Sequence, residues 1–350
     1  MKIAVFSLPL FVAVGSISQT AAFVPQHTRN LTKPSTSKLL SSVSNVNANA
    51  NANVNTSPTS SSPGTKRTAV LICPAQFCVP ADYEKLISTL RSKSPTMSSG
   101  RVANLPRTEW IKVAKQLPTS EFFSANLNNA KTLDWYFKAI ENGLAEIYAE
   151  EGDDVNVCLI GHSIGGWVAR SYLGGLSQSS TSVYRETIKR CTSLITLGSP
   201  HRAPGTALVD QTRGLLRAVE ERRECSVEGL KENGISVTCV LSTAVKGNLF
   251  TNNLEEIVAT TSYLPLIDDW TKITSGVKGD GIIPEDLAFM DGCNRVVVEK
   301  CTITGNNVRH AHVLPTPYNL WAPAAPSISL PEDFCWYGSE GVIDSWVEYV

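Results

Sequence analysis

The chain has 350 residues, 42% of them hydrophobic, and a formal net charge of −1 at pH 7. The first 67 residues carry six basic and no acidic side chains, so residues 68–350 carry a net charge of −7. An acidic balance without a basic stripe excludes the usual electrostatic surfaces for nucleic acid and for anionic lipid. The 283 residues after the basic segment are enough for one large domain with a substantial core.

The N-terminal segment has the layout of a secretory signal peptide. Lys2 precedes an apolar run over residues 3–14, and small residues follow as far as Ala21 and Ala22. The apolar run is too short to span a bilayer stably. We therefore expect a cleaved signal peptide over residues 1–22.

Residues 23–67 have the composition of a transit peptide. They are rich in Ser, Thr and Asn, contain no acid, and include an Asn-Ala tract with too little apolar surface to fold. The junction Ala-Ala-Phe-Val-Pro at residues 21–25 resembles the bipartite presequences of diatom-type algae, in which the aromatic residue, here Phe23, becomes the first residue after cleavage. The resemblance implies delivery to the plastid (chloroplast), and ordinary secretion is the alternative.

Nine cysteines are scattered along the chain in an odd number and without a tight framework, which favours free thiols in a reducing compartment. Cys158 lies within an expected strand, so we expect it to be buried. Cys73 and Cys78 flank the loop after the first expected strand, where a redox-sensitive pair is an alternative. No Cys/His spacing resembles a zinc site, and we expect neither a metal nor a cofactor.

Strand and helix patterns alternate through residues 68–350. The helix pattern is clearest at residues 133–150, where apolar residues such as Phe137, Ile140 and Leu144 recur at helical spacing. We expect strands at residues 68–73, 102–104, 155–160, 193–197, 237–242 and 294–302, and helices at residues 81–93, 133–150, 167–176, 210–221 and 339–350. Buried apolar strands separated by helices predict an α/β fold, with a mostly parallel central sheet covered by helices on both faces.

The sequence Gly-His-Ser-Ile-Gly-Gly at residues 161–166 lies between an expected strand and an expected helix. A Gly-x-Ser-x-Gly stretch in this context is typical of a nucleophile elbow, a turn so tight that only small residues fit two positions either side of the serine. The serine hydroxyl then stands at a helix N-terminus, where the helix dipole favours developing negative charge. We predict Ser163 to be a catalytic nucleophile.

A serine nucleophile needs a general base, and histidine has a suitable pKa. The chain has five histidines. His27 lies in the targeting region, His162 belongs to the turn itself, and His201 comes too early for the chain order Ser, acid, His. His310 and His312 remain, and in an extended chain they face opposite ways, so that only one can serve. We favour His312 as the base, with His310 as the alternative.

The acid is expected between the nucleophile and the base, in a loop after a late strand. Asp280, in Lys-Gly-Asp-Gly-Ile-Ile-Pro at residues 278–284, is the strongest candidate because the glycines let the loop approach the imidazole. Its task is to orient the histidine and stabilise the imidazolium. Asp268 and Asp269 are the alternatives.

The oxyanion hole is expected from two backbone N–H groups. One belongs to Ile164, directly after the nucleophile. The other belongs to the loop after the first strand, Pro-Ala-Gln-Phe at residues 74–77, where its order implies Gln76.

These stretches resemble the α/β-hydrolase superfamily, and more closely a plant and algal branch of plastid hydrolases that is distantly similar to GPI inositol-deacylase-like and lipase-like proteins. The matching stretches cover residues 81–86, 133–136, 159–170, 197–201, 210–216, 279–284 and 336–338. In that branch the Gly-Asp-Gly aspartate and a histidine before a short Pro-containing loop complete a triad, which implies Asp280 and His312.

The chain departs from that branch at two places. The first-strand loop of the family reads Pro-Gly-x-Gly, and here Ala75 and Phe77 replace the two glycines, which implies an altered oxyanion geometry. A Pro-rich insertion follows His312 at residues 315–331 and is placed to cover the site.

The segment of residues 201–277 is longer than a simple crossover connection between strands requires, and we expect a cap insertion there. Apolar residues of this region either line an entrance to the site or form the core of the cap: Leu208, Leu215, Leu216, Val219, Tyr263, Leu264, Leu266 and Ile267. An apolar mouth suits an acyl ester or another lipid-like substrate.

The sequence thus predicts a serine hydrolase that cleaves a carboxylic ester through a covalent acyl-enzyme, and we expect this ester to be a lipid. A thioesterase or a chlorophyll-phytol esterase with the same triad is the alternative among enzymes. A catalytically silent hydrolase fold that binds a ligand is the alternative from another class. The expected partners are a small-molecule or lipid ester and, peripherally, a membrane surface.

Overall fold

The protein is described by a computed structural model, which covers residues 67–350 except 153, 178–180, 204–209, 268, 270, 315–321 and 332. The expected signal peptide, the expected transit peptide as far as residue 66, and the candidate residues Leu208 and Asp268 lie outside the described residues. Within the described part of the chain, no helix is both long enough and apolar enough to cross a membrane.

A six-stranded sheet in the order β2-β1-β3-β4-β5-β8 forms the centre of the domain, and all its strand pairs are parallel. Its strands are β1 (Arg67–Cys73), β2 (Met97–Val102), β3 (Val155–His162), β4 (Cys191–Leu197), β5 (Ser236–Ser242) and β8 (Asn294–Val298). Parallel strands of this kind require crossover connections, which helices supply here. The predicted α/β-hydrolase fold, with a parallel sheet between helical layers, is confirmed.

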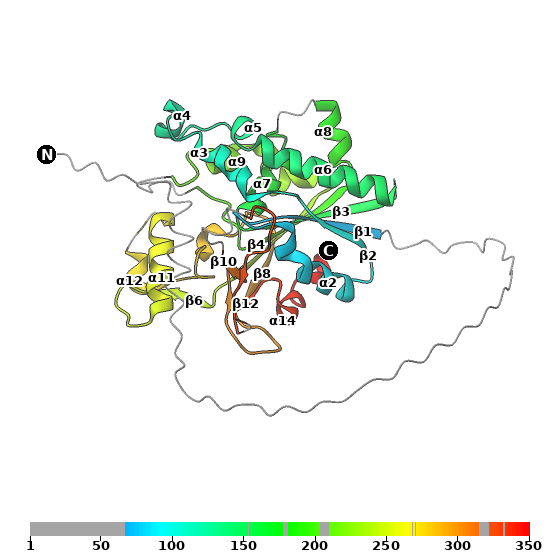
Figure 1. Ribbon diagram of the computed structural model, residues 1–350. Helices are drawn as coiled ribbons and strands as arrows, with labels where there is room; N and C mark the ends of the chain where they lie inside the picture. The colour runs from blue at the N-terminus through cyan, green and yellow to red at the C-terminus, as the bar shows by residue number, and fades with distance from the viewer. Residues whose placement is uncertain are drawn as a thin grey trace, which may run out of the picture. The chain divides into compact units, whose positions relative to one another are not determined.

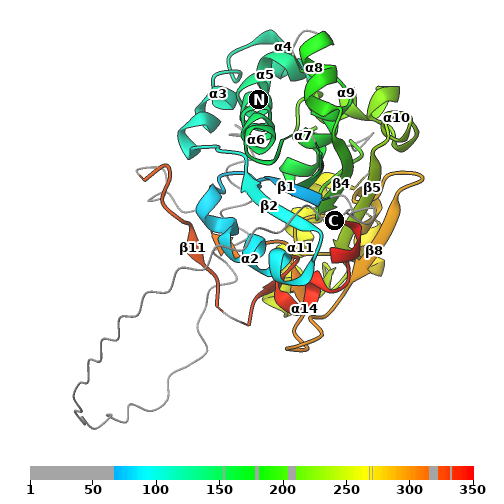
Figure 2. The same cartoon turned by 90° about the vertical axis from the view of Figure 1, so that its right-hand side faces the viewer.

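Two hydrophobic cores lie on opposite faces of the sheet because side chains alternate along each strand. On β1, Leu71 belongs to one core and Ile72 to the other, and neither is exposed. The first core packs under α6 (Asp134–Glu151) and α7 (Ile164–Leu173), and the second under α2 (Glu84–Lys93) and α14 (Glu340–Ile343). Figures 1 and 2 show these two helical layers on either side of the sheet.

The remaining elements are short and surround this frame. The other α-helices are α3 (Ile111–Ala114), α4 (Ser120–Phe123), α5 (Asn129–Thr132), α8 (Thr181–Ile188), α9 (Leu215–Glu221), α10 (Val227–Glu232), α11 (Leu254–Tyr263) and α12 (Lys272–Ser275). The 3₁₀ helices are η1 (Pro80–Tyr83), η2 (Arg107–Trp110), η3 (Arg223–Cys225), η4 (Leu264–Leu266), η5 (Glu285–Leu287) and η6 (Val347–Tyr349). In the described part of the chain, two-stranded sheets pair β6 (Val245–Gly247) with β7 (Val277–Gly279), β10 (Val313–Leu314) with β11 (Ile328–Ser329), and β9 (Val308–Arg309) with β12 (Cys335–Trp336).

Several expected elements lie elsewhere or are shorter; the strand expected at residues 294–302, for example, ends at Val298. The strand expected at residues 102–104 is β2, at Met97–Val102. It lies at the edge of the sheet, and its polar sequence, Met-Ser-Ser-Gly-Arg-Val, lacks the apolar pattern of a buried strand. The helix expected from residue 210 begins only at Leu215, because the Asp210 carboxylate accepts the backbone N–H groups of Thr212 and Gly214 in a preceding turn. The C-terminal helix is limited to Glu340–Ile343, followed by η6.

The region expected to form a cap, residues 201–277, is not one insertion. Strand β5 divides it and lies within the central sheet between β4 and β8. The apolar residues expected at an entrance are mostly core: Leu215, Leu216 and Val219 join the first core, and Tyr263 and Ile267 a third, smaller one with Val245, Ala259 and Ile273. Leu264 and Leu266 are only partly buried, and they pack against the third and the first core, respectively.

Candidate active site

Ser163 occupies the turn between β3 and α7 in a strained backbone conformation, with φ 54° and ψ −125°. Non-glycine residues rarely adopt this region, and such strain is typical of functional sites. The neighbouring glycines are required by contact: a Cβ at Gly165 would lie 2.1 Å from the Cys73 carbonyl oxygen, and one at Gly161 would lie 2.3 Å from the Gly166 Cα. The predicted elbow geometry is therefore present.

His310 connects Ser163 to Asp280. The Ser163 Oγ lies 2.9 Å from His310 Nε2, and His310 Nδ1 lies 2.7 Å from Asp280 Oδ2. In the tautomer that this arrangement requires, the serine hydroxyl donates to Nε2 and the Nδ1–H donates to the carboxylate. The backbone N–H of His310 also donates to the Asp280 carbonyl, at 3.0 Å, which fixes the two residues against each other.

The Asp280 carboxylate is buried, 1% exposed, and accepts four hydrogen bonds. Oδ1 accepts the backbone N–H groups of Ile282 and Ile283, at 3.0 and 2.7 Å, while Oδ2 accepts His310 and the Tyr337 hydroxyl. Burial, followed by the charge of Asp280, raises the pKa of Tyr337 well above its usual value, so this hydroxyl keeps its proton and remains a donor. Buried carboxylates are stable only when hydrogen-bonded in this way.

His312 does not contact Ser163, and our expectation that it rather than His310 would meet the nucleophile is wrong. Its Nε2 donates to the backbone carbonyl of Asp82 at 2.6 Å, and its ring stacks on Trp336 with centroids 3.7 Å apart. Burial lowers the pKa of His312, which favours a neutral ring that packs like an aromatic side chain. The two histidines do face different partners, as the spacing predicts.

The remaining candidate acid, Asp269, is exposed and belongs to a turn before α12. Its carboxylate accepts the hydroxyl and the backbone N–H of Thr271, and these bonds lower the pKa of Asp269. It plays no part in the Ser163 arrangement. Among the described residues, Asp280 is the carboxylate that meets a histidine beside Ser163.

A buried chain of hydrogen bonds joins the loop after β1 to His310. The Ala75 N–H donates to the Tyr83 hydroxyl at 2.8 Å, and that hydroxyl lies 2.9 Å from His162 Nδ1. His162 Nε2 in turn lies 2.8 Å from the His310 carbonyl. Burial, and then the proximity of His310, lowers the pKa of His162 well below its usual value, so the ring is neutral and can accept at one nitrogen and donate at the other.

The loop after β1, residues 74–78, is held on both sides of Gln76. The Tyr136 hydroxyl donates to the Pro74 carbonyl at 2.6 Å, and the Cys78 N–H donates to the Ala75 carbonyl at 3.1 Å. Phe77 has a φ of 61°, in the left-handed region that a glycine would adopt freely. None of the hydrogen bonds found among the described residues uses the Gln76 backbone N–H.

The second expected oxyanion donor, the N–H of Ile164, belongs to the first turn of α7. N–H groups of a first helical turn have no acceptor within their own helix and are therefore available to an anion. Both expected donors thus belong to backbone segments next to Ser163 or to the loop after β1, and their roles remain predictions.

Cys73 and Cys78 are both buried, and Cys158 is buried as expected. Burial raises the pKa of Cys78 to about 12, and burial raises that of Cys73 further. Both groups therefore remain thiols at neutral pH, which does not favour a reactive pair. In the described part of the chain, no three or more His, Cys, Asp or Glu side chains are grouped to hold a metal ion.

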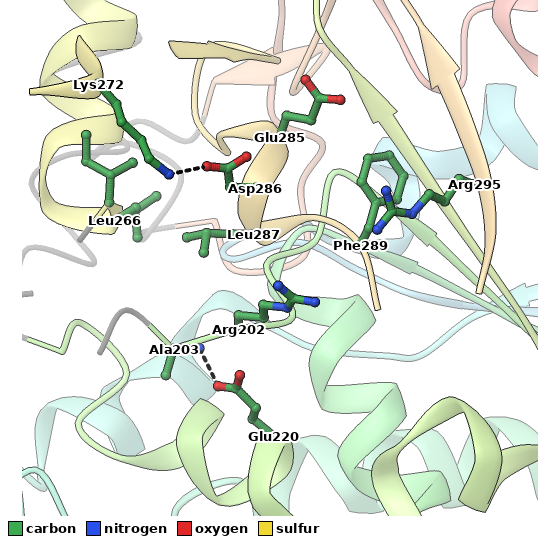
Figure 3. A pocket seen from close by; sticks show the side chains of 11 residues that line it. Arg202, Ala203, Glu220, Leu266, Lys272, Glu285, Asp286, Leu287, Phe289 and Arg295 are labelled. Carbon is green, nitrogen blue, oxygen red and sulfur yellow. Dashed lines mark hydrogen bonds and ion pairs between the residues drawn. The ribbon is translucent and has the colours of Figure 1, made fainter. Parts of the chain in front are cut away.

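A cavity of about 560 Å³ opens at the surface between the loop after β4, α9, η4, α12 and η5. Its lining is charged, and Figure 3 shows Lys272 paired with Asp286, and Glu220 accepting the backbone N–H of Ala203. None of Ser163, Asp280 and His310 lines it. The cavity is therefore distinct from the serine site.

Sequence reasoning missed two groups of this site, Tyr337 and the pair formed by Tyr83 and His162. Both tyrosines lie in stretches that resemble the family, at residues 336–338 and 81–86, but nothing in a single sequence assigns them a partner. Their contacts join residues 57 and 79 positions apart, respectively. Only the fold brings such residues together.

Comparison with known proteins gives one family match and several distant structural likenesses. Residues 113–279 match the model of the PGAP1-like alpha/beta domain. No curated protein sequence matches the chain. Among solved structures, Aspergillus fumigatus lipase B has a TM-score of 0.36 and 14% identity, with 80% of this chain and 61% of that chain covered.

Two further likenesses cover less of the protein. An acetyl xylan esterase has a TM-score of 0.28 and 14% identity, with 41% of this chain and 68% of that chain covered. The phospholipase PlaB from Legionella pneumophila has a TM-score of 0.28 and 15% identity, with 52% and 38% covered. Likenesses this distant transfer neither substrate nor mechanism. Residues 113–279 are thus similar to the PGAP1-like alpha/beta domain, and the sheet order and the turn at Ser163 are those of an α/β-hydrolase fold.

Proposed function

We propose that the protein is a serine hydrolase that cleaves a carboxylic ester. Ser163 is the nucleophile, His310 is the base, and Asp280 is the carboxylate that orients the histidine. The observation that carries this proposal is the linear arrangement of the three side chains, with 2.9 Å from Ser163 Oγ to His310 Nε2 and 2.7 Å from His310 Nδ1 to Asp280 Oδ2. Hydrogen-bond reach between nucleophile, base and orienting acid is the geometric requirement of such a triad.

In the proposed reaction, Ser163 Oγ attacks the ester carbonyl carbon while its proton passes to His310 Nε2. The tetrahedral oxyanion is stabilised by the N–H groups of Gln76 and Ile164. The C–O bond to the alcohol then breaks, and His310 gives its proton to the leaving oxygen. Water attacks the acyl-enzyme with the same proton transfers, which releases the acid and restores Ser163. Asp280 holds the histidine tautomer and stabilises the imidazolium throughout.

For the substrate class we propose a lipid-like acyl ester. Large apolar side chains lie exposed on α4 and near α11, among them Phe123 at 75% and Phe250 at 83% exposure. Such side chains suit contact with an acyl chain or with a membrane surface that supplies it. Activity against p-nitrophenyl esters from acetyl to dodecanoyl tests this class. A kcat/KM that rises with acyl length supports it, and a preference for acetyl contradicts it.

A fluorophosphonate probe tests the hydrolase itself. We expect covalent labelling of Ser163 in the unmodified protein and none in Ser163→Ala, because the probe reacts only with a serine that a neighbouring base activates. The absence of labelling would favour the catalytically silent binding protein over the enzyme, whereas labelling at another residue would show that Ser163 is not the nucleophile. Rates of hydrolysis of thioesters and of chlorophyllide phytyl esters, measured beside those of p-nitrophenyl esters, distinguish the alternative activities from the proposed one.

We further propose that residues 1–67 direct the protein to the plastid. The support is compositional: an apolar run after Lys2, an aromatic residue at the expected cleavage site, and an acid-free tail. A fusion of residues 1–67 to a fluorescent protein in a diatom-type alga should reach the plastid. Phe23→Ala should leave the cleaved fusion outside the stroma, whereas secretion of the unmodified fusion would contradict the proposal.

A further inference from the structure

Arg107 lies in η2, only 1% exposed, between two segments that are far apart in the chain. Its Nε donates to the Phe77 carbonyl at 2.8 Å. Its Nη1 donates to the carbonyls of Ala322 and Ala325, at 3.1 and 2.6 Å, and its Nη2 donates to the Ser327 hydroxyl at 2.7 Å. A single guanidinium therefore ties the loop after β1 to the described part of the Pro-rich insertion.

Asp82 completes the buried cluster. Its carboxylate lies 3.7 Å from the Arg107 guanidinium and accepts the backbone N–H and the hydroxyl of Ser327, at 2.6 and 2.9 Å. It also accepts the Val79 N–H at 2.9 Å, on the other side of the loop after β1. Neither charged side chain is exposed, so the charge of each is compensated by the other and by these hydrogen bonds.

The carbonyl that Arg107 holds belongs to a residue in an unfavourable conformation. Phe77 has a φ of 61°, which disfavours a side chain with a Cβ. A bond to the Phe77 carbonyl restrains the peptide that follows this residue. The same loop carries Gln76, whose N–H is the proposed oxyanion donor.

We infer that Arg107 is a positioning residue for the oxyanion loop: its guanidinium holds Phe77 in the left-handed conformation that presents the Gln76 N–H to the reacting carbonyl. The inference rests on the proposed hydrolase function. It assigns the insertion a structural purpose, since Ala322, Ala325 and Ser327 fix the guanidinium from the side opposite the loop. A mispositioned oxyanion donor lowers transition-state stabilisation more than it lowers substrate binding.

Arg107→Lys tests the inference, because a lysine keeps the charge but has no planar fork to bind several acceptors at once. With the concentration of active sites measured by fluorophosphonate titration, we expect kcat to fall about 10- to 100-fold and KM to change less than about threefold, the range typical of a displaced oxyanion donor. Affinity for a trifluoromethyl ketone that forms the tetrahedral adduct should weaken in parallel with kcat/KM. Arg101→Lys is the matched control and should leave both unchanged, because Arg101 is a partly exposed arginine of β2 that pairs with Glu146 and Glu150.

A double substitution separates positioning from simple destabilisation. Phe77→Gly removes the cost of the positive φ, whereas Phe77→Ala removes the same ring and retains the cost. We expect Arg107→Lys/Phe77→Gly to be at least about fivefold faster than Arg107→Lys/Phe77→Ala, which corresponds to about 1 kcal/mol of conformational preference.

Two outcomes overturn the inference while leaving the proposed hydrolase intact. If Arg107→Lys lowers the melting temperature but keeps kcat per titrated site within twofold, the cluster is only structural. If the glycine and alanine double variants are equally slow, Arg107 does not act through the conformation of Phe77. Failure of the unmodified protein to react with the probe overturns the proposed hydrolase and this inference together, so the two failures are distinguishable.

Discussion

The Tyr337 hydroxyl and the His310 ring donate to the same oxygen of Asp280, Oδ2, each at 2.7 Å. The hydroxyl also accepts the Ser242 N–H at 3.0 Å, so the end of β5 fixes its position. A Cβ at Gly198, after β4, would lie 2.6 Å from this same Asp280 oxygen, so the glycine makes room for the carboxylate. Two strand ends and the segment after β12 therefore hold the acid in place.

Tyr337→Phe is expected to lower kcat about tenfold with little change in KM, because the carboxylate loses one of the donors that orient it toward His310. The free energy of unfolding should fall by about 1–3 kcal/mol, since the buried Ser242 N–H loses its acceptor. Steady-state kinetics and urea unfolding measure the two effects. Tyr148→Phe, which removes a hydroxyl bonded to the Thr187 carbonyl, is the control for the loss of a tyrosine hydroxyl and should leave kcat unchanged.

The two neighbouring histidines should differ sharply in their effect on activity. His310→Ala is expected to reduce kcat by several orders of magnitude, and adding Ser163→Ala should reduce it little further because triad members act as a unit. His312→Ala should retain most of the activity, since this ring contacts Asp82 and Trp336 and not the nucleophile. Hydrolysis of a p-nitrophenyl ester measures both, and the reverse ranking would overturn the assignment of the base.

The strained backbone at Ser163 should affect the free energy of unfolding of variants at this position. Ser163→Gly and Ser163→Ala should both be inactive, but only glycine relieves the φ of 54°. We expect the glycine variant to have a free energy of unfolding about 1 kcal/mol above that of the alanine variant, the lower end of the cost of such conformations. Chemical denaturation of the two variants measures the difference, and equal stabilities would show that the turn is not strained.

Acid should destabilise the fold through its buried histidines. Burial lowers the pKa values of His162 and His201 well below the usual value and lowers that of His312, whereas unfolded histidines titrate near pH 6.5. Below about pH 7 the unfolded chain therefore binds more protons, so the free energy of unfolding falls as the pH falls from about 7 toward 5, by at most about 1.4 kcal/mol per pH unit for each histidine.

His201→Asn tests this linkage outside the serine site. Asparagine offers the Thr196 hydroxyl a partner in place of His201 Nε2, which lies 3.0 Å from it, but it does not titrate. The slope of unfolding free energy against pH should therefore be smaller for this variant between pH 5 and 7. Near pH 8 histidine protonation should contribute nothing to the free energy of unfolding of either protein. Equal slopes would show that His201 does not contribute.

The sequence predicts the local parts of the site better than the parts that depend on contacts between residues far apart in the chain. The elbow is local: strand, glycines, serine and helix lie within one short stretch, and the structure has them as expected. The choice between His310 and His312 depends on β9 pairing with β12 and β10 with β11, contacts that the sequence near the histidines does not encode. Asp280 could be predicted because its flanking glycines mark the loop.

The edge strand β2 and the Arg107 cluster also depend on contacts that the nearby sequence does not encode. Ser98, Ser99 and Gly100 have weak strand preferences, and β2 forms because its backbone pairs with β1. Arg107 lies 220 residues from Ser327, and an arginine in a short polar stretch has no local mark of burial. Such contacts become visible only when the whole chain is folded.

The segment that carries Tyr337 is also anchored by the end of the chain, because the buried Trp346 donates its indole N–H to the Tyr337 carbonyl at 3.0 Å. During synthesis Ser163 leaves the ribosome long before these residues do. A nascent chain that has not yet reached residues 337–346 therefore holds Ser163 without the groups that orient Asp280. If the proposed function is correct, hydrolysis should begin only after these residues have been made and have folded.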